Sequence, residues 1–242
     1  MEKTVTEAIA YRRSVRIYKE DIELDDEIVR KCLLNAPLAP TSSNMQLWEF
    51  YHVTDKTKLK ALSKACFDQP AAKTAKQLVV VVTRKDLWRK RSKANLDFIK
   101  KGFEKTTDKK DSTREKFILN YYKKLIPTLY TEFLGILGAL RFIFFQIVGL
   151  FRPIYRQVRK SDMRIVAHKS AALAAQNFMI SMSAVGYDTC PMEGSDTLRI
   201  KRILDLPWGA EINMVIACGV RDDKGVYGPR FRIPFEEVYH KI

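Results

Sequence analysis

Histidine and cysteine are scarce in this chain of 242 residues, and their placement excludes several kinds of site. The three histidines are far apart and none has the His-x-x-x-His or carboxylate spacing of a metal centre, so we expect no bound metal. The four cysteines are scattered and contain no Cys-x-x-Cys pair. This pattern excludes a zinc knuckle, argues against a disulfide framework, and fits a reducing cytosol.

Three sequence fingerprints of common enzyme classes are also missing. The chain has no Gly-x-Ser-x-Gly nucleophile elbow, no Gly-x-x-x-x-Gly-Lys-Ser/Thr phosphate loop and no Gly-x-Gly-x-x-Gly dinucleotide fingerprint. Difficult chemistry, if present, is therefore expected to belong to a cofactor. Residues 1–18 are polar and contain no apolar run typical of a secretory signal, so we expect a cytoplasmic protein.

Positive charge is abundant, but it is concentrated in one part of the chain. The formal net charge is +15, and residues 84–160 hold 20 lysines and arginines against 7 acidic residues, a balance of +13. The remaining residues contribute only +2. The sequence therefore describes a nearly neutral protein that carries one basic segment.

Hydrophobic patterning indicates alternating helices and strands outside that segment. We expect helices over residues 5–12, 25–34, 56–66 and 196–206, and strands over 49–53, 78–83 and 212–220. The strand at 78–83 contains four consecutive valines, which is typical of a strand that is buried on both faces.

An alanine-rich stretch from residue 167 to 194 is expected to form the central helix. Leu173, Phe178 and Met182 are placed on one side of it, and Gly186 is expected to end it. Residues 187–191 are expected to form a turn fixed by proline, followed by Glu193-Gly194, which suits the presentation of backbone N–H groups to a flat ligand. A buried helix followed by an ordinary loop is the alternative.

Two arginine clusters lie near the ends of the chain. Arg12-Arg13-Ser14-Val15-Arg16 and Arg230-x-Arg232 offer guanidinium and hydroxyl donors that suit a phosphate dianion. A solvated basic turn is the alternative for the first cluster.

The basic segment also holds an apolar run at residues 133–151, interrupted by Arg141 and Gln146. Three interpretations remain open for it: a helical hairpin that is buried or covered by a partner, an interfacial segment on an anionic membrane, and a membrane-spanning helix. Nineteen residues are close to the minimum for a span, and a central arginine costs about 2.5–3.5 kcal/mol on insertion scales.

Four ordered motifs together resemble the nitroreductase family of FMN-dependent oxidoreductases. They are the two arginine clusters, the loop from Pro40 to Trp48 and the stretch Cys190-Pro-Met-Glu-Gly194, and the resemblance covers about residues 3–83 and 162–235. It implies an α+β fold with a central, mostly antiparallel sheet flanked by helices, in an intertwined homodimer. Residues 1–83 and 162–242 would form one FMN-binding domain, and residues 84–161 a basic and apolar helical insert.

The resemblance also implies how a flavin would be held. Arg12, Arg13, Ser14 and Arg16 would bind the phosphate and ribityl chain, and Arg230 and Arg232 would close on the phosphate. Ser42, Ser43 and Asn44 would reach the flavin from the second subunit. Gln69 and Lys73 would contact the pyrimidine edge, although Lys73 also fits an ordinary solvated lysine. In the stretch Pro191, Met192, Glu193 and Gly194, the backbone of the last two residues would donate to flavin N5 and O4.

The function that follows is a ping-pong oxidoreductase without catalytic side chains of its own. NAD(P)H, or a protein electron donor, would reduce the FMN, and an electrophilic acceptor such as a nitroaromatic or a quinone would then oxidise it. In an alternative, the basic insert docks the same fold on a membrane, through residues 125–160, or on an acidic electron carrier. A nucleic-acid-binding module is disfavoured, because aromatic residues are few in the basic segment and its cations do not share one helical face.

Overall fold

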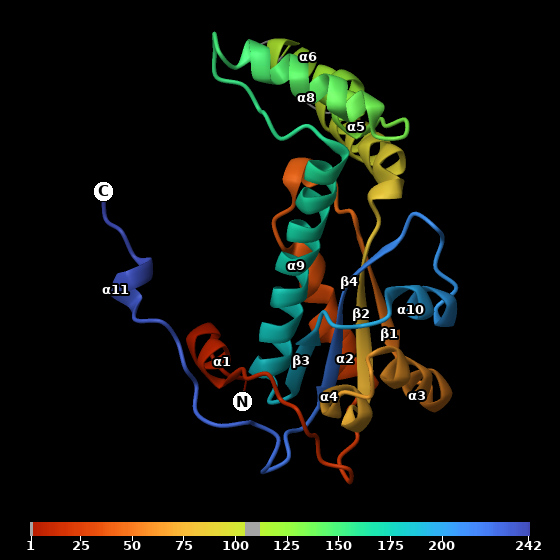
Figure 1. The fold of residues 1–242 in the computed structure, drawn as a ribbon, viewed down its shortest axis with the longest axis vertical. Helices are drawn as coiled ribbons and strands as arrows, with labels where there is room; N and C mark the ends of the chain where they lie inside the picture. The colour runs from red at the N-terminus through yellow and green to blue at the C-terminus, as the bar shows by residue number, and fades with distance from the viewer. Residues whose placement is uncertain (1, 105–111) are drawn as a thin grey trace.

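An open four-stranded sheet forms the centre of the molecule (Figure 1). The computed structural model describes residues 2–104 and 112–242. The strands are β1 (Trp48–Val53), β2 (Gln77–Thr83), β3 (Asp188–Met192) and β4 (Glu211–Gly219), in the order β1-β2-β4-β3. Every neighbouring pair is antiparallel. The expected α+β class with an antiparallel sheet is confirmed.

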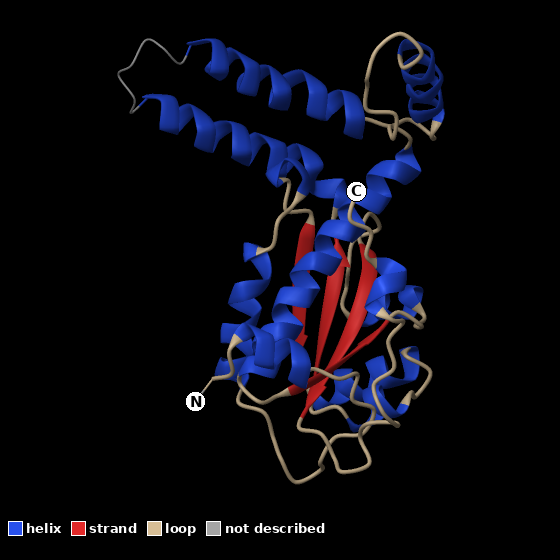
Figure 2. Ribbon diagram, turned by 90° about the vertical axis from the view of Figure 1, so that its left-hand side faces the viewer, coloured by secondary structure: helices blue, strands red, loops and turns tan. Residues whose placement is uncertain are grey.

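The valine run explains why β2 lies inside the sheet, with helices on both faces (Figure 2). Side chains on a strand alternate between faces. Val80 and Val82 accordingly pack into one hydrophobic cluster, and Val79 and Val81 into another. All four valines are fully buried. A run without polar alternation is stable here because both faces of the strand are covered.

The helices α9 (Lys160–Ala184) and α2 (Asp26–Asn35) cover one face of the sheet, and α1 (Val5–Tyr11) packs against α9. Ala171, Ala174 and Ala175 are fully buried, and their small side chains let the helix backbone approach its neighbours closely. Gly186, at φ +87°, follows the end of the helix as expected. Leu173 departs from the prediction: it is 48% exposed, whereas Phe178 and Met182 are buried.

The opposite face carries α3 (Lys56–Ala65), α4 (Pro70–Thr74) and α10 (Thr197–Ile203). Leu62 of α3 and Ile200 of α10 are fully buried in the same cluster as the even-numbered valines of β2. Asp55 and Asp196 cap α3 and α10 by accepting backbone N–H bonds. These caps explain why each helix begins directly after an aspartate.

The expected proline turn at residues 187–191 is wrong, because Asp188–Met192 is strand β3. Pro191 has no N–H group to donate, and an edge strand has one side on which no ladder bond is needed. The free edge of β3 also receives a short parallel bridge from Ser14 to Thr189.

The basic segment forms helices that project beyond the end of the sheet near the start of α9 (Figures 1 and 2). They are α5 (Trp88–Glu104), α6 (Ser112–Asn120), a π-helical turn (Tyr121–Leu125), α7 (Ile126–Tyr130) and α8 (Ile136–Val148). The apolar run at 133–151 thus contains a helix of 13 residues, not 19. Among the described helices, none combines the length and apolarity needed to cross a membrane.

An arm at the C-terminus, residues 227–242, leaves the body of the molecule (Figure 1). Its short helix α11 (Phe235–Val238) contains no buried residue. Phe231, Phe235 and Tyr239 are 75%, 65% and 53% exposed, and the last two stack on each other. The arm therefore presents apolar surface that this chain alone does not cover.

Candidate functional site

Two segments from opposite ends of the chain meet around a polar pocket of about 250 Å³. Its lining residues are Arg12, Arg13, Ser14, Arg16, Val226, Tyr227, Pro229, Arg230, Phe231 and Arg232. Six residues that the sequence marked as phosphate ligands therefore come together, although more than 200 positions separate the two clusters.

Backbone pairing holds the first arginine cluster in place. The Val15 N–H donates to the Thr189 carbonyl of β3 at 3.2 Å, and the Arg16 N–H donates to the Gly225 carbonyl at 2.6 Å. Just beyond β4, the Arg221 guanidinium pairs with the buried Asp188 carboxylate. The segment is thus fixed between the edge of the sheet and the loop that follows β4.

The second cluster is joined to the first by side-chain hydrogen bonds to backbone carbonyls. Arg13 Nη2 donates to the Gly228 carbonyl at 2.9 Å. Arg230 Nη2 donates to the carbonyls of Ala10 at 2.8 Å and Arg12 at 2.6 Å. Because these bonds use few guanidinium donors, most of the N–H groups remain available to a ligand.

The pocket concentrates positive charge without internal compensation. None of the described residues that line it is acidic. Burial lowers the pKa of Arg12, and the positive charges of Arg230, Arg232 and Arg13 also lower it. A multivalent anion would relieve this repulsion and accept charge-assisted hydrogen bonds from several arginines at once.

A second group of predicted residues lies at the far end of β3. Glu193 and Gly194 follow the strand and are exposed. Gln69, just before α4, donates from Nε2 to the Gly194 carbonyl at 2.8 Å, so its amide and the Glu193-Gly194 backbone share one location. Pro191 and Met192 lie within β3, where the Met192 side chain is buried.

Lys73 is placed less specifically than Gln69. It lies one turn later on α4, is exposed, and lines a groove with Lys60, Lys64 and Asp68. In the part of the chain that the structure describes, no hydrogen bond or ion pair joins it to Gly194. Its role in ligand binding stays a prediction.

Cys190 lies near the arginine pocket but is not suited to nucleophilic chemistry. Burial raises the pKa of its thiol, and this effect exceeds the opposing influence of Arg16 and Arg12. A protonated, buried thiol is a weak nucleophile. All four cysteines are free and buried, so no disulfide is formed.

Ser42, Ser43 and Asn44 are not near the arginine pocket of the same chain. Ser42 lies beside Ser170 in the first half of α9, whereas Ser183 near the end of α9 donates to the Ala8 carbonyl of α1, next to the pocket. The 13 residues between the two serines span about 20 Å of helix. Within one chain, the two halves of the predicted site remain apart.

Three residues of the basic segment hold the Ser42–Asn44 loop, and the sequence did not mark them. The Tyr121 hydroxyl lies 2.5 Å from Ser43 Oγ, and the Tyr122 hydroxyl donates to the Ser43 carbonyl at 2.9 Å. Asn95 exchanges two hydrogen bonds with Asn44, at 2.7 and 2.8 Å. Ser43 and Asn44 both have positive φ angles, a strained backbone that needs such support.

Because of these contacts, Asn95→Ala should destabilise the protein. Asn95 is 9% exposed, so its removal leaves polar groups of Asn44 without partners in a mostly buried place. We expect the free energy of unfolding to fall by about 1–3 kcal/mol, measured by urea denaturation. Asn120→Ala, at an exposed position on α6, is the control and should change it by less than about 0.5 kcal/mol. Equal losses in both variants would contradict the assigned role.

Comparison with known proteins identifies the family of the chain. The family model described as "Nitroreductase family" matches residues 9–220. Protein DrgA of Synechocystis is 27% identical over 217 residues, which cover 90% of this chain and 84% of DrgA. An NADH dehydrogenase of Thermus thermophilus is 26% identical over 228 residues, 94% of this chain and 90% of that protein.

Solved structures show the same fold. A protein of Exiguobacterium sibiricum, crystallised in complex with FMN, superposes with a TM-score of 0.67 at 20% identity and covers 99% of this chain and 98% of that one. The family match extends over most of the chain and includes the first arginine cluster and all four strands. The chain belongs to the nitroreductase family.

Proposed function

We propose that this protein is an FMN-dependent oxidoreductase that passes electrons from NAD(P)H to an electrophilic small molecule, such as a nitroaromatic or a quinone, by a ping-pong mechanism. The observation that carries the proposal is the polar pocket in which five arginines converge without an acidic partner among the described lining residues. A phosphate dianion fits this charge and this donor chemistry. The FMN complex of the E. sibiricum relative and the name of the T. thermophilus relative support the cofactor and the donor.

The residues of the chain would bind and orient the flavin. The arginine pocket would hold its phosphate, and the exposed backbone at Glu193-Gly194, fixed by Gln69, would face the reactive edge of the ring. When bound, FMN would accept a hydride from NAD(P)H and return the electrons to the second substrate. In this proposal no side chain acts as an acid, base or nucleophile, in keeping with the raised pKa of the Cys190 thiol.

A comparison of FMN with riboflavin tests the phosphate site directly. Arg12→Gln/Arg16→Gln should weaken FMN binding by about 100-fold, because each arginine contributes a charge-assisted hydrogen bond. Binding of riboflavin, which lacks the phosphate, should change little. Arg202→Gln, at an exposed position on α10, controls for loss of positive charge and should leave both affinities unchanged. Flavin fluorescence quenching measures the affinities.

The redox half of the proposal is checked with the same protein. Anaerobic addition of NADH or NADPH should bleach the flavin absorbance of the wild-type protein. A protein that binds no flavin after reconstitution would overturn the proposed function. A bound flavin that neither NADH nor NADPH bleaches would overturn the proposed donor.

We also propose that the active form is a homodimer. The support is geometric: Ser42–Asn44 lie about 20 Å along α9 from the arginine pocket of their own chain, and the C-terminal arm exposes apolar side chains. A second copy would cover the arm and supply the missing half of each site.

Substitutions in the arm should therefore weaken dimerisation. In analytical ultracentrifugation we expect a dimer for the wild-type protein and a shift toward monomer for Phe235→Ser/Tyr239→Ser, since both rings are exposed in the single chain. Trp208→Ser, which alters a 90% exposed side chain outside the arm, is the control. A wild-type monomer that binds FMN at full occupancy would contradict the proposal.

A second candidate adds membrane docking to the same enzyme. The outer face of α8 exposes apolar side chains, among them Leu140, Phe144 and Ile147 at 59%, 61% and 54%, within a segment whose net charge is +13. Apolar surface beside cations suits the interface of an anionic bilayer. The lipid-soluble acceptor would then be met at the membrane.

Vesicle sedimentation tests this candidate. Wild-type protein should bind vesicles that contain phosphatidylglycerol, and binding should fall at higher ionic strength because exposed charges are screened. Phe144→Ser/Ile147→Ser should reduce the bound fraction several-fold by removing the apolar contact, while Trp208→Ser should not. Undiminished binding by the double variant would refute docking through α8.

A further inference from the structure

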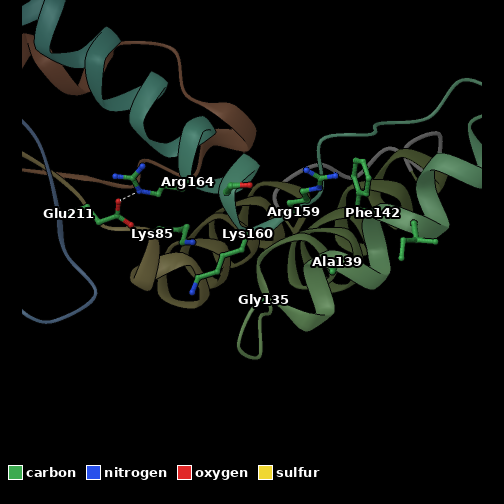
Figure 3. Close-up of a pocket in the computed structure, with 10 residues that line it drawn as sticks. Lys85, Gly135, Ala139, Phe142, Arg159, Lys160, Arg164 and Glu211 are labelled. Carbon is green, nitrogen blue, oxygen red and sulfur yellow. Dashed lines mark hydrogen bonds and ion pairs between the residues drawn. The ribbon is translucent and has the colours of Figure 1, made fainter.

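An open pocket of about 720 Å³ lies between α8 and the first turn of α9 (Figure 3). Its lining residues are Lys85, Gly135, Ala139, Phe142, Ile143, Arg159, Lys160, Ser161, Arg164 and Glu211. The sequence marked none of them as a flavin ligand. Six of them lie within residues 125–160, the stretch that the membrane-docking alternative names: Gly135, Ala139, Phe142, Ile143, Arg159 and Lys160. This pocket differs from the arginine pocket because it combines a charged end with an apolar wall.

The charged end has more positive than negative groups. Glu211 is the single acidic lining residue among those described, and its carboxylate already accepts hydrogen bonds from Arg164 Nε and from His168 Nε2 at 3.1 Å. The ammonium groups of Lys85 and Lys160 have no hydrogen bond or ion pair within the described ranges. Because Glu211 is already paired, the two lysines leave net positive charge in the pocket.

The charged form of Lys85 has no partner among the described residues that offsets the cost of its partial burial. Burial lowers the pKa of Lys85, and the positive charges of Lys160 and Arg164 act in the same direction against the opposing effect of Glu211 and Glu132. The nearby Glu132 is itself paired with Arg141. An anion between Lys85 and Lys160 would offset both the desolvation and the repulsion.

The opposite wall is apolar. Figure 3 shows Ala139 and Phe142 of α8 on the side of the pocket away from Lys85 and Glu211. The Arg159 guanidinium lies 3.5 Å from the centroid of the Phe142 ring, so its charge is placed on the aromatic face.

Close packing fixes this wall relative to the lysines. A Cβ on Gly138 would lie 2.9 Å from the Lys160 backbone nitrogen, so a glycine there lets α8 lie directly against the start of α9. The apolar wall and the charged end therefore belong to one packed unit.

We propose that this pocket binds an amphiphilic anion, with its acidic head group between Lys85 and Lys160 and its apolar chain or ring along Ala139, Phe142 and Ile143. A purely apolar ligand would leave the partly buried ammonium group of Lys85 without a partner. A small inorganic anion would leave the apolar wall in contact with water. A ligand with both parts satisfies both ends. The inference does not depend on flavin binding.

Calorimetric titration of the full-length protein with dodecanoate tests the proposal. Wild-type protein should bind dodecanoate more tightly than dodecanol, which has the chain without the charge, and than acetate, which has the charge without the chain. Lys85→Gln/Lys160→Gln should weaken dodecanoate binding by about tenfold or more, as expected for lost charge-assisted hydrogen bonds. Ile143→Ser should weaken it through the apolar wall.

Two matched control variants distinguish loss of this site from a general loss of positive charge and from misfolding. Lys100→Gln/Lys101→Gln removes the same charge from exposed positions on α5 and should bind dodecanoate like the wild type. Lys85→Arg/Lys160→Arg keeps both charges and should retain binding. Equal affinity for dodecanoate and dodecanol, wild-type affinity in the glutamine double variant, or absence of dodecanoate binding by the wild type would each overturn the proposal.

A last comparison identifies the source of the anion. Vesicles of phosphatidylcholine with and without phosphatidylglycerol are sedimented with the wild type and the glutamine double variant. If the double variant loses dodecanoate but still binds phosphatidylglycerol vesicles, the pocket takes a free amphiphile. If it loses both, while the control double variant retains both, the pocket takes the head group of an anionic lipid from the bilayer. Both results support the site, and the flavin content of the variants should not change.

Discussion

The constraint on which the arrangement depends is the pairing of residues 14–19 between the edge of β3 and the chain just beyond β4. Backbone bonds from Val15 to Thr189 and from Lys19 to Val220 fix this segment, and the buried Asp188 carboxylate anchors Arg221 beside it. Without this attachment, mutual repulsion would separate the arginines of the two clusters. The sheet thus supplies the energy that keeps like charges together, as the proposed site for a multivalent anion would require before binding.

The basic segment contacts the other half of the predicted site, the Ser42–Asn44 loop, which lies apart from the arginine pocket of the same chain. Asn95, Tyr121 and Tyr122 hold Ser43 and Asn44 in a left-handed backbone conformation that short polar loops do not keep unaided. Tyr121 and Tyr122 are consecutive, and the π-helical turn in which they lie directs both hydroxyls to the same serine. A π-helical turn is rare and is often found at functional sites. The projecting helices of the basic segment therefore determine the shape of the loop that precedes β1.

Much of the fold could be predicted from local patterns because the relevant forces are local. Four valines predicted β2, Gly186 predicted the end of α9, and Asp25 predicted the start of α2. Edge strand β3 could not be predicted this way, since Pro191 signals a turn unless the position of the strand in the sheet is known. The placement of Leu173 on the same side as Phe178 and Met182 was wrong for a related reason. Spacing along the sequence suggests a face, but tertiary packing decides which side chains are covered, and Leu173 is 48% exposed.

The candidate site, like the fold, could be predicted only in part from the sequence. The arginines were singled out by their donor chemistry and by a family resemblance, and Gln69 and Glu193-Gly194 by the resemblance alone. The structure brings the arginines around one pocket and places Gln69 beside Gly194 at the far end of β3. Asn95 gave no signal, because its partner Asn44 lies 51 positions away and an asparagine on a charged helix is unremarkable. The length of α8 could not be predicted from the sequence either, because an apolar run of 19 residues does not reveal that Phe133 and Phe151 lie outside the helix.

The two cationic pockets differ in the property that selects a ligand. Both are lined by at least four basic residues, so Coulomb attraction alone would not distinguish their occupants. The arginine pocket is mostly polar, although Val226, Pro229 and Phe231 also line it. It presents planar, forked donors, which favour a compact dianion with several oxygen acceptors. The pocket between α8 and α9 has the charges of Lys85 and Lys160 at one end and Ala139, Phe142 and Ile143 at the other. Part of the binding energy of the proposed amphiphilic anion would therefore come from burial of apolar surface. If both proposals hold, charge would attract an anion to either pocket, and the wall opposite the charge would decide which anion each pocket retains.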